Sequence, residues 1–186
     1  MDRRSLKTRK ALCKGLEELL IEKELRQVTV QEVADKADVN RVTFYKHYLD
    51  VYDLYEKIEK EVLSELGILV LELENLPSED CLARLIGYID ENRTVFKMIF
   101  SPNTTGQLRN KLARLMQGIF RQLQSEKQHT ELTDSRMDYQ NCYRSQGCMA
   151  VIGKWVVGDF KEPKEFVIRI LSELDGNTEK YISSHH

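Results

Sequence analysis

The stretch VTVQEVADKADVNRVTFYKHYLDVYDLYEKI, from Val28 to Ile58, predicts two short helices joined by a tight turn. Thr29 and Glu32 have the spacing of a capping box, in which each side chain bonds the backbone N–H of the other residue. A helix should therefore begin directly after Thr29. A second helix should follow Asn40, because Asn is a favoured N-cap residue.

The second of these helices is too polar for a core helix and too aromatic for an ordinary surface helix. Phe44 and Tyr48 lie one turn apart and should pack on the preceding helices. Its other side chains are Arg41, Val42, Thr43, Tyr45, Lys46 and His47. Arg can bridge O6 and N7 of guanine, an apolar group can meet a thymine methyl, and hydroxyl or cationic groups can bind phosphates. This pattern favours a helix that enters the major groove of DNA over the alternative, a solvated surface helix.

The rest of the chain reads as helices, so the fold class should be all-α. One apolar stripe precedes the quoted stretch, at Leu12, Leu16, Leu19 and Leu20. Amphipathic helices should follow Asp50, Ser78 and Pro163, with a long apolar helix from Met137 to Phe160. We predict a three-helix DNA-binding domain over residues 1–48 and a helical effector-binding and dimerisation domain over residues 49–186.

The distribution of charge agrees with this division. Residues 1–48 hold 11 Lys and Arg against 8 Asp and Glu, whereas residues 49–186 hold 17 against 22. A basic end on an acidic body suggests an anionic partner at that end only. Arg3, Arg4 and Lys7 are either part of this DNA-binding surface or part of a disordered, nonspecific arm.

Other functions find little support. The sequence holds no nucleophile motif, no glycine-rich phosphate loop and no metal-ligand spacing, so we expect no catalytic residues, no metal and no cofactor. The four cysteines should be free thiols of a cytoplasmic protein. No apolar run resembles a signal peptide or a membrane span, so no membrane partner is expected.

The stretch from Val28 to Ile58 resembles the DNA-binding domain of the TetR family of transcriptional repressors. The matching residues are Thr29, Val33, Ala34, Ala37, Val39, Thr43, Phe44, Tyr45, His47, Tyr48 and Leu54. The resemblance implies that Thr43, Tyr45 and His47 contact phosphates and that Arg41, Val42 and Lys46 face bases or nearby backbone. The full set expected at the DNA is Thr29, Asn40, Arg41, Val42, Thr43, Tyr45, Lys46 and His47.

Two positions depart from the family pattern. Asp38 stands where the family has a turn glycine, and Asp tolerates the left-handed conformation less well than Gly. Val51 stands where the family has a phosphate-contacting lysine. That loss puts one DNA contact in doubt and keeps an alternative open: a helical interaction protein, or a ligand-free regulator, with a degenerate DNA-binding head.

The resemblance also implies a homodimer formed by the last two long helices and a pocket for a small apolar or aromatic effector. The Met137–Phe160 helix is apolar around much of its circumference, and its small residues Gly147, Ala150 and Gly153 permit close helix approach. Candidate pocket residues, which could equally be plain core, are Tyr88, Phe96, Met98, Phe100, Met116, Phe120, Tyr139, Tyr143 and Trp155. The stretch Gly153–Pro163 is weakly similar to regulators akin to the dihydroxyacetone kinase activator, which leaves open a protein-responsive regulator.

Overall fold

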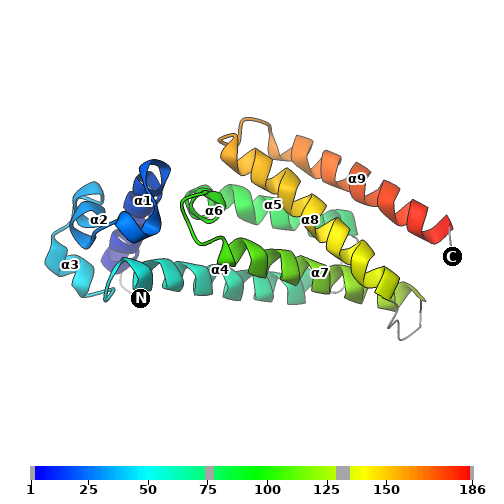
Figure 1. Cartoon of the computed structure of the whole chain (residues 1–186), viewed down its shortest axis with the longest axis horizontal. Coiled ribbons are helices and arrows are strands. Elements are labelled where there is room, and N and C mark those ends of the chain that lie inside the picture. The colour runs from blue at the N-terminus through cyan, green and yellow to red at the C-terminus, as the bar shows by residue number, and fades with distance from the viewer. Residues whose placement is uncertain (1–2, 74–77, 129–134, 185–186) are drawn as a thin grey trace. The chain divides into compact units, whose positions relative to one another are not determined.

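The computed structural model describes residues 3–73, 78–128 and 135–184, and all regular elements within these ranges are helical. The predicted all-α fold is thereby confirmed. The first elements are α1 (Arg3–Glu22), η1 (Leu25–Gln27), α2 (Val30–Lys36), α3 (Arg41–Tyr45) and α4 (Val51–Leu73). They are followed by α5 (Ser78–Glu91), α6 (Arg93–Phe100), α7 (Gln107–Gln128), α8 (Ser135–Val157) and α9 (Lys164–Ser184), as Figure 1 shows.

The chain divides into two compact units, which we describe separately. The N-terminal unit comprises residues 1–68 and 92–108, and the C-terminal unit comprises residues 69–91 and 109–186. These units are defined by contacts within the chain, and α4 contributes residues to both of them. The functional division expected at residue 48 stays a prediction.

The core of the N-terminal unit forms where α1, α2, α3 and the start of α4 meet. Leu12, Leu16 and Leu20 of the predicted stripe are fully buried, and Phe44 of α3 packs in the same cluster. Met98 of α6 belongs to this core as well, although it lies far along the chain. The N-terminal core therefore needs a helix that local sequence patterns do not assign to it.

Polar contacts fasten α6 and the following loop to α1. The Leu20 carbonyl, at the end of α1, accepts hydrogen bonds from Oγ of Ser101 at 3.0 Å and from Nδ2 of Asn103 at 2.6 Å. Nζ of Lys97 lies 3.8 Å from Oε1 of Glu17, a carboxylate whose pKa is raised by burial although Lys97 opposes that shift. The hydrogen bonds from Ser101 and Asn103 satisfy the Leu20 carbonyl, which lies in the last turn of α1 and has no partner within the helix.

The turn between α2 and α3 requires a left-handed residue. Asp38 has a φ of 51°, which confirms the conformation expected from its position in the place of a turn glycine. Its N–H donates to the Asp35 carbonyl at 3.2 Å, and the next N–H, of Val39, donates to the Ala34 carbonyl at 3.0 Å. This reversal at the end of α2 directs the chain into α3.

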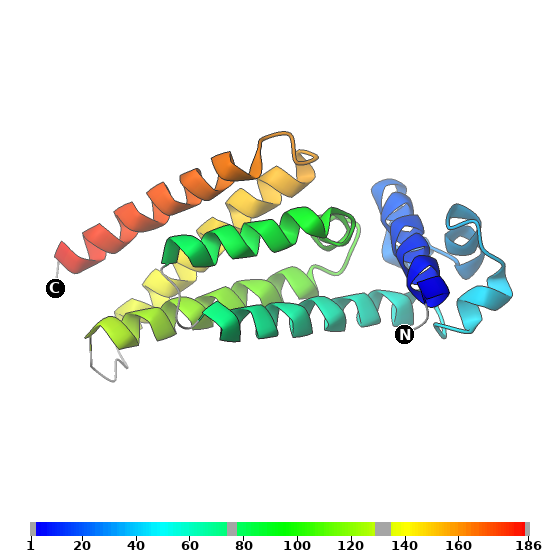
Figure 2. The same ribbon diagram turned by 180° about the vertical axis from the view of Figure 1, so that it is seen from behind.

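In the C-terminal unit, α9 packs against both α5 and α8, and Figure 2 shows α8 and α9 running side by side. The α8 helix ends at Val157 and not at the predicted Phe160, because Asp159 and Phe160 have positive φ angles of 58° and 55°. Phe160 then turns inward and packs edge-on against the Trp155 ring at 4.7 Å between centroids. None of the helices in the described ranges is long and apolar enough to cross a membrane.

Candidate nucleic-acid interface

The α3 helix begins with a side-chain cap and is fastened by two aromatic residues. Oδ1 of Asn40 accepts a hydrogen bond from the Val42 N–H at 2.8 Å, as expected for an N-cap. Phe44 and Tyr48 are both buried, with ring centroids 5.6 Å apart. A helix of only five residues has little stability of its own, so these anchors fix its position.

The side chains expected at the DNA surround this anchored helix. Arg41, Val42, Tyr45 and Lys46 are exposed, and Val42 is exposed to 63%. Thr43 and His47 are half-buried. Lys46 and His47 follow the last residue of α3, so the final turn lies beyond the regular helix. The structure thus gathers two cations, an aliphatic group and an aromatic hydroxyl on the exposed surface of one short segment.

Arg41 and Tyr45 form a pair on that surface. Nη2 of Arg41 donates to the Tyr45 hydroxyl at 2.9 Å, and the guanidinium lies 5.3 Å from the ring centroid. The two residues are one helical turn apart, the spacing at which side chains on a helix meet. These two contacts hold the guanidinium against Tyr45 on the outside of α3.

The capping box predicted at the start of α2 is present. Oγ1 of Thr29 accepts from the Glu32 N–H at 3.3 Å, and Oε2 of Glu32 accepts from the Thr29 N–H at 2.9 Å. A hydrogen bond from Lys23, together with those from Thr29, lowers the pKa of Glu32 to about 2. Thr29 is exposed, but its hydroxyl already holds the helix start.

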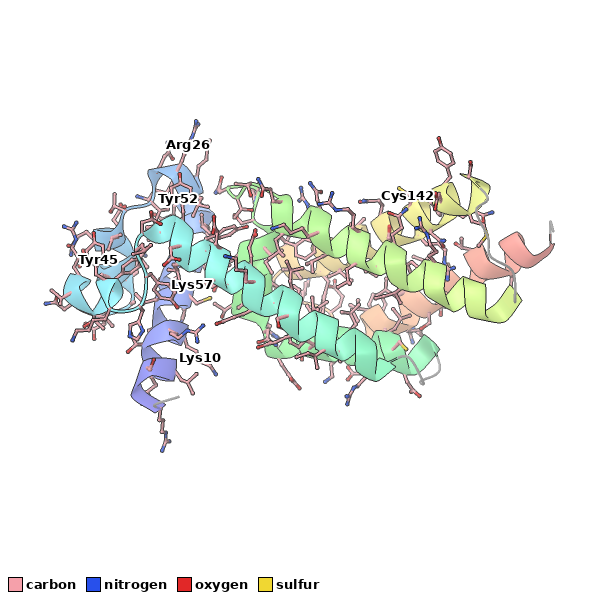
Figure 3. The ribbon with its side chains drawn as sticks, turned by 90° about the horizontal axis from the view of Figure 1, so that it is seen from below. Lys10, Arg26, Tyr45, Tyr52, Lys57 and Cys142 are labelled. Atoms are coloured by element: carbon pink, nitrogen blue, oxygen red, sulfur yellow. The ribbon has the colours of Figure 1, made fainter. Side chains whose placement is uncertain are left out.

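A lysine that sequence reasoning did not select lies beside the end of α3. Nζ of Lys57, on α4, donates to the His47 carbonyl at 3.2 Å and lies over the Tyr48 ring at 5.2 Å. It also pairs with Asp53 at 2.9 Å, and this bond, with one from the Leu49 N–H, lowers the pKa of Asp53. Figure 3 labels Lys57 on α4 and Tyr45 on α3. The single signal for Lys57 in the sequence was a lysine one helical turn after Asp53.

Val51 is not a surface residue. It is the first residue of α4 and is buried in the core of the N-terminal unit. The position that carries a phosphate-contacting lysine in the family pattern is therefore occupied by a side chain directed into the protein. Val51 thus departs from the family pattern, and its aliphatic side chain contributes to the core instead.

The basic residues at the N-terminus are helical. Arg3, Arg4 and Lys7 lie in the first two turns of α1, which corrects the alternative of a disordered arm. Arg3 and Lys7 are exposed. Arg9 differs from them, because it pairs with Glu61 of α4 and its Nε donates to the Tyr48 hydroxyl at 3.3 Å. That cation helps to hold α1 against α4 and against the segment that follows α3.

The structure does not gather the candidate pocket residues in one place. Phe96, Met98 and Phe100 are buried in α6 within the N-terminal unit, and Met98 is part of its core. The others belong to the C-terminal unit: half-buried Tyr88, buried Met116 and Phe120, buried Trp155, and exposed Tyr139 and Tyr143. The indole N–H of Trp155 donates to the Glu162 carbonyl at 2.8 Å, so this residue closes the turn after α8.

An exposed strip of α8 and α9 carries apolar side chains. Tyr139 and Tyr143 are exposed to 79% and 71%, and Gly147 and Ala150 continue the strip toward exposed Val157. Phe166 and Leu174 are exposed on α9. Of the small residues noted in the sequence, Gly147 and Ala150 thus lie at the surface of the single chain, where a second helix could approach closely, and Gly153 is half-buried.

The cysteines differ in how far they are buried. Cys13, Cys81, Cys142 and Cys148 are free, and burial raises the pKa of Cys13 and of Cys148 to about 12. A thiol with so high a pKa is a poor nucleophile near neutral pH. Among the described residues, no three His, Cys, Asp or Glu side chains are grouped as a metal site would require.

Comparison with known proteins agrees with this geometry. A family profile described as bacterial regulatory proteins of the tetR family matches residues 13–58. A profile of a transcriptional regulator C-terminal region matches residues 78–174. The chain is 22% identical over 164 residues to the uncharacterized HTH-type transcriptional regulator YxbF of Bacillus subtilis. That alignment covers 84% of this chain but 41% of the relative, so the chain spans about two-fifths of its length.

Several solved structures share the fold. The fatty acid degradation regulator FadR from Bacillus halodurans has a TM-score of 0.64 at 12% identity, covering 94% of this chain and 95% of its own. NalD of Pseudomonas aeruginosa, the secondary repressor of a multidrug efflux pump, has a TM-score of 0.61 at 18% identity, covering 95% and 98%. The dihydroxyacetone kinase operon activator DhaS has a TM-score of 0.57 at 17% identity, covering 95% and 96%. With both of its halves matched by regulator profiles and its helix-turn-helix in place, the chain belongs to the TetR family of bacterial transcriptional regulators.

Proposed function

We propose that this regulator is a homodimeric repressor that reads a near-palindromic operator with α3 and is released from it by a small effector. The observation that carries the proposal is the exposed surface of α3. Arg41, Val42 and Tyr45 project from a helix whose orientation is fixed by buried Phe44 and Tyr48, and exposed Lys46 follows its last residue. Such a helix is rigid enough to present the same groups to every DNA site that it tests.

Each exposed group has a distinct role in this proposal. Arg41, at the first residue of α3, bridges O6 and N7 of a guanine, and Val42 meets a thymine methyl. Thr43, Tyr45 and His47 donate to phosphate oxygens, and Lys46 pairs with phosphate or a base edge. Thr29 and Asn40, whose side chains cap α2 and α3, contribute by fixing the starts of the two helices at the DNA.

The buried Val51 removes one phosphate contact from this set. The exposed cations Arg3 and Lys7 in the first turns of α1 are the proposed replacement. Because phosphate contacts are electrostatic and independent of sequence, cations at another position on the head restore affinity without changing which sequence is preferred. The compensation therefore preserves the reading role of α3.

Dimerisation is proposed through the exposed apolar strip of α8 and α9. Tyr139, Tyr143 and Val157 are large apolar side chains left in water by the single chain. A second copy would cover them and place Ala150 at the close approach of the two α8 helices. Two recognition helices in a dimer read half-sites about one DNA turn apart, roughly 34–36 Å, which makes the operator a near-palindrome.

Repression and release complete the proposal. NalD is a repressor, and DhaS is an operon activator, so the shared fold by itself leaves the sign of regulation to experiment. In this proposal, the dimer represses transcription while it occupies the operator. An effector ends the repression by removing the dimer from the DNA. An effector releases DNA only through a difference in its affinity for the DNA-bound and free conformations.

Selection from a random DNA pool tests this proposal. The full chain and its Arg41→Ala variant would each be used to enrich bound sequences over several rounds. We expect the full chain to enrich a near-palindrome, and we expect Arg41→Ala to lose the preference at one base pair of each half-site. A pool that stays random after selection with the full chain would reject the DNA-reading role of α3.

A further inference from the structure

The inward side of α8 contains a polar residue among apolar ones. Asn141 is 0% exposed. Met137, Cys148 and Ile152 are buried on the same helix at positions four, seven and eleven residues away, the spacing of one helical face. The amide of Asn141 is therefore buried on the inward side of α8, where apolar residues and the buried polar residues Arg144 and Ser145 share its face.

Neither polar atom of this amide is paired. Among the described residues, Oδ1 of Asn141 accepts no hydrogen bond and its Nδ2 donates none. Oε1 of the preceding residue, Gln140, is likewise buried and unpaired. Buried amides without partners are uncommon in native proteins, because each leaves water without recovering the hydrogen bonds it made there. Two adjacent buried amides with unpaired polar atoms indicate a site for a partner that can itself donate and accept hydrogen bonds.

The neighbouring polar groups are already engaged with one another. Nε and Nη2 of Arg144 donate to the two carboxylate oxygens of Asp175 at 2.7 Å and 2.8 Å. The guanidinium also lies 4.3 Å from the Phe120 ring centroid. Oγ of Ser145 donates to the Cys142 carbonyl at 2.9 Å. The charge of Arg144 is thus neutralised within the unit, one helical turn from Asn141.

These contacts define the chemistry that would fit. A primary carboxamide or a lactam offers an N–H to Oδ1 of Asn141 and a C=O to its Nδ2, so both atoms are paired. A carboxylate can only accept, so Oδ1 stays unpaired, and Asp175 already takes the positive charge that would attract it. A hydrocarbon pairs neither atom.

We propose that Asn141, assisted by Gln140, is the polar anchor of the effector site, and that the effector is an uncharged molecule with an amide-like donor and acceptor edge. This inference rests on the proposed effector-released regulator and specifies its ligand class. It adds a polar requirement to the apolar or aromatic effector that the sequence suggests.

Thermal melting of the full chain without DNA tests the inference with three matched probes. Benzamide carries the donor and acceptor edge, benzoate carries the anion, and ethylbenzene carries neither. We expect benzamide to raise the Tm of the wild type in a saturable way and benzoate to bind at least tenfold more weakly. In Asn141→Leu, the benzamide shift should disappear while ethylbenzene binds as well as or better than before.

Gln146→Leu is the matched control, because Gln146 is an exposed amide on the same helix. This variant should respond to benzamide as the wild type does. If Asn141→Leu fails to fold, Asn141→Ala removes the same amide without adding bulk and should lose the benzamide shift.

Two results would overturn the inference. One is an equal benzamide shift in the wild type and in the Asn141 variants, which would place the ligand elsewhere. The other is no benzamide shift in the wild type combined with a higher Tm for Asn141→Leu. That result would show that the unpaired amide destabilises the fold and binds no ligand. Because the melts contain no DNA, either result leaves operator binding, measured separately, as an independent test of the proposed function.

Discussion

The guanidinium of Arg41 lies over the ring of Tyr45, and the Tyr45 hydroxyl accepts a hydrogen bond from it at 2.9 Å. Both residues are exposed and lie one turn apart on α3. An arginine already held by a neighbouring side chain loses less side-chain entropy when it meets a base. We therefore propose that Tyr45 positions Arg41, in addition to the phosphate contact proposed for its own hydroxyl.

The Tyr45→Phe variant tests this relationship, because it keeps the ring and removes the hydroxyl. We expect discrimination at the base pair read by Arg41 to fall about threefold to tenfold, the size of one modest hydrogen bond. In the Arg41→Ala background, the same change should leave discrimination at that base pair unaltered. The measurement is the ratio of Kd values for the preferred site and a site changed at that base pair. Equal effects of Tyr45→Phe in both backgrounds would show that the hydroxyl acts on DNA independently of Arg41.

Asp38 should be a position where glycine stabilises the fold. Its φ of 51° costs an L-residue strain that glycine avoids. We expect Asp38→Gly to raise the free energy of unfolding by about 0.5–1 kcal/mol in urea denaturation. Asp35→Gly, at an exposed position within α2, is the matched control and should lower the free energy of unfolding, because glycine is a poorer helix former than Asp and the hydrogen bond from Gln31 is lost. A loss of stability in both variants would contradict the strain argument.

The capping box should make stability depend on acid pH. Hydrogen bonds from Lys23 and Thr29 lower the pKa of Glu32 to about 2 in the folded chain, from an ordinary value of 4.5. A lowered pKa stabilises the fold above the unfolded value, and this stabilisation is lost as the pH falls from about 5 toward 2. We therefore expect Glu32→Gln to melt below the wild type at pH 7, with the gap closing over that range. A gap that stays constant from pH 7 to pH 3 would contradict the assignment.

Local signals in the sequence were sufficient to predict α2, the turn after it and α3. The capping box at Thr29, the N-cap at Asn40 and the left-handed residue at Asp38 each depend on a few neighbouring residues, and the structure confirms all three. The burial of Phe44 and Tyr48 likewise follows from their spacing of one turn. Such features are predictable because the backbone geometry that they satisfy is local.

Contacts between residues far apart in the sequence could not be predicted from local patterns. Met98 joins the N-terminal core and Lys57 reaches the His47 carbonyl only because separate helices meet in the fold. The rotation of α8 about its axis places Tyr139 and Tyr143 outside and Asn141 inside. Since α8 carries both polar and apolar residues around its circumference, periodicity does not decide which side faces the interior.

The dimer proposal has a direct test in Ala150→Arg. Ala150 is exposed on α8 between the two halves of the apolar strip, and a large cation there would block close approach of a second α8. We expect the wild type to sediment as a dimer and the variant as a monomer that keeps its helical circular dichroism. Ala83→Arg introduces the same charge at an exposed position on α5 and should remain dimeric. An Ala150→Arg protein that stays dimeric would place the interface elsewhere.

The central claim, that α3 reads DNA sequence, is tested most directly by measuring affinity for the selected operator and for a shuffled duplex over a series of salt concentrations. We predict that log K falls linearly with log salt, with a slope of about −0.9 for each phosphate neutralised. Arg41→Ala should lower the preference for the operator by about 1–3 kcal/mol, while Arg26→Ala, which removes an exposed arginine of η1, should leave it unchanged. Affinity that does not depend on salt, or an operator preference that Arg41→Ala does not alter, would contradict the account.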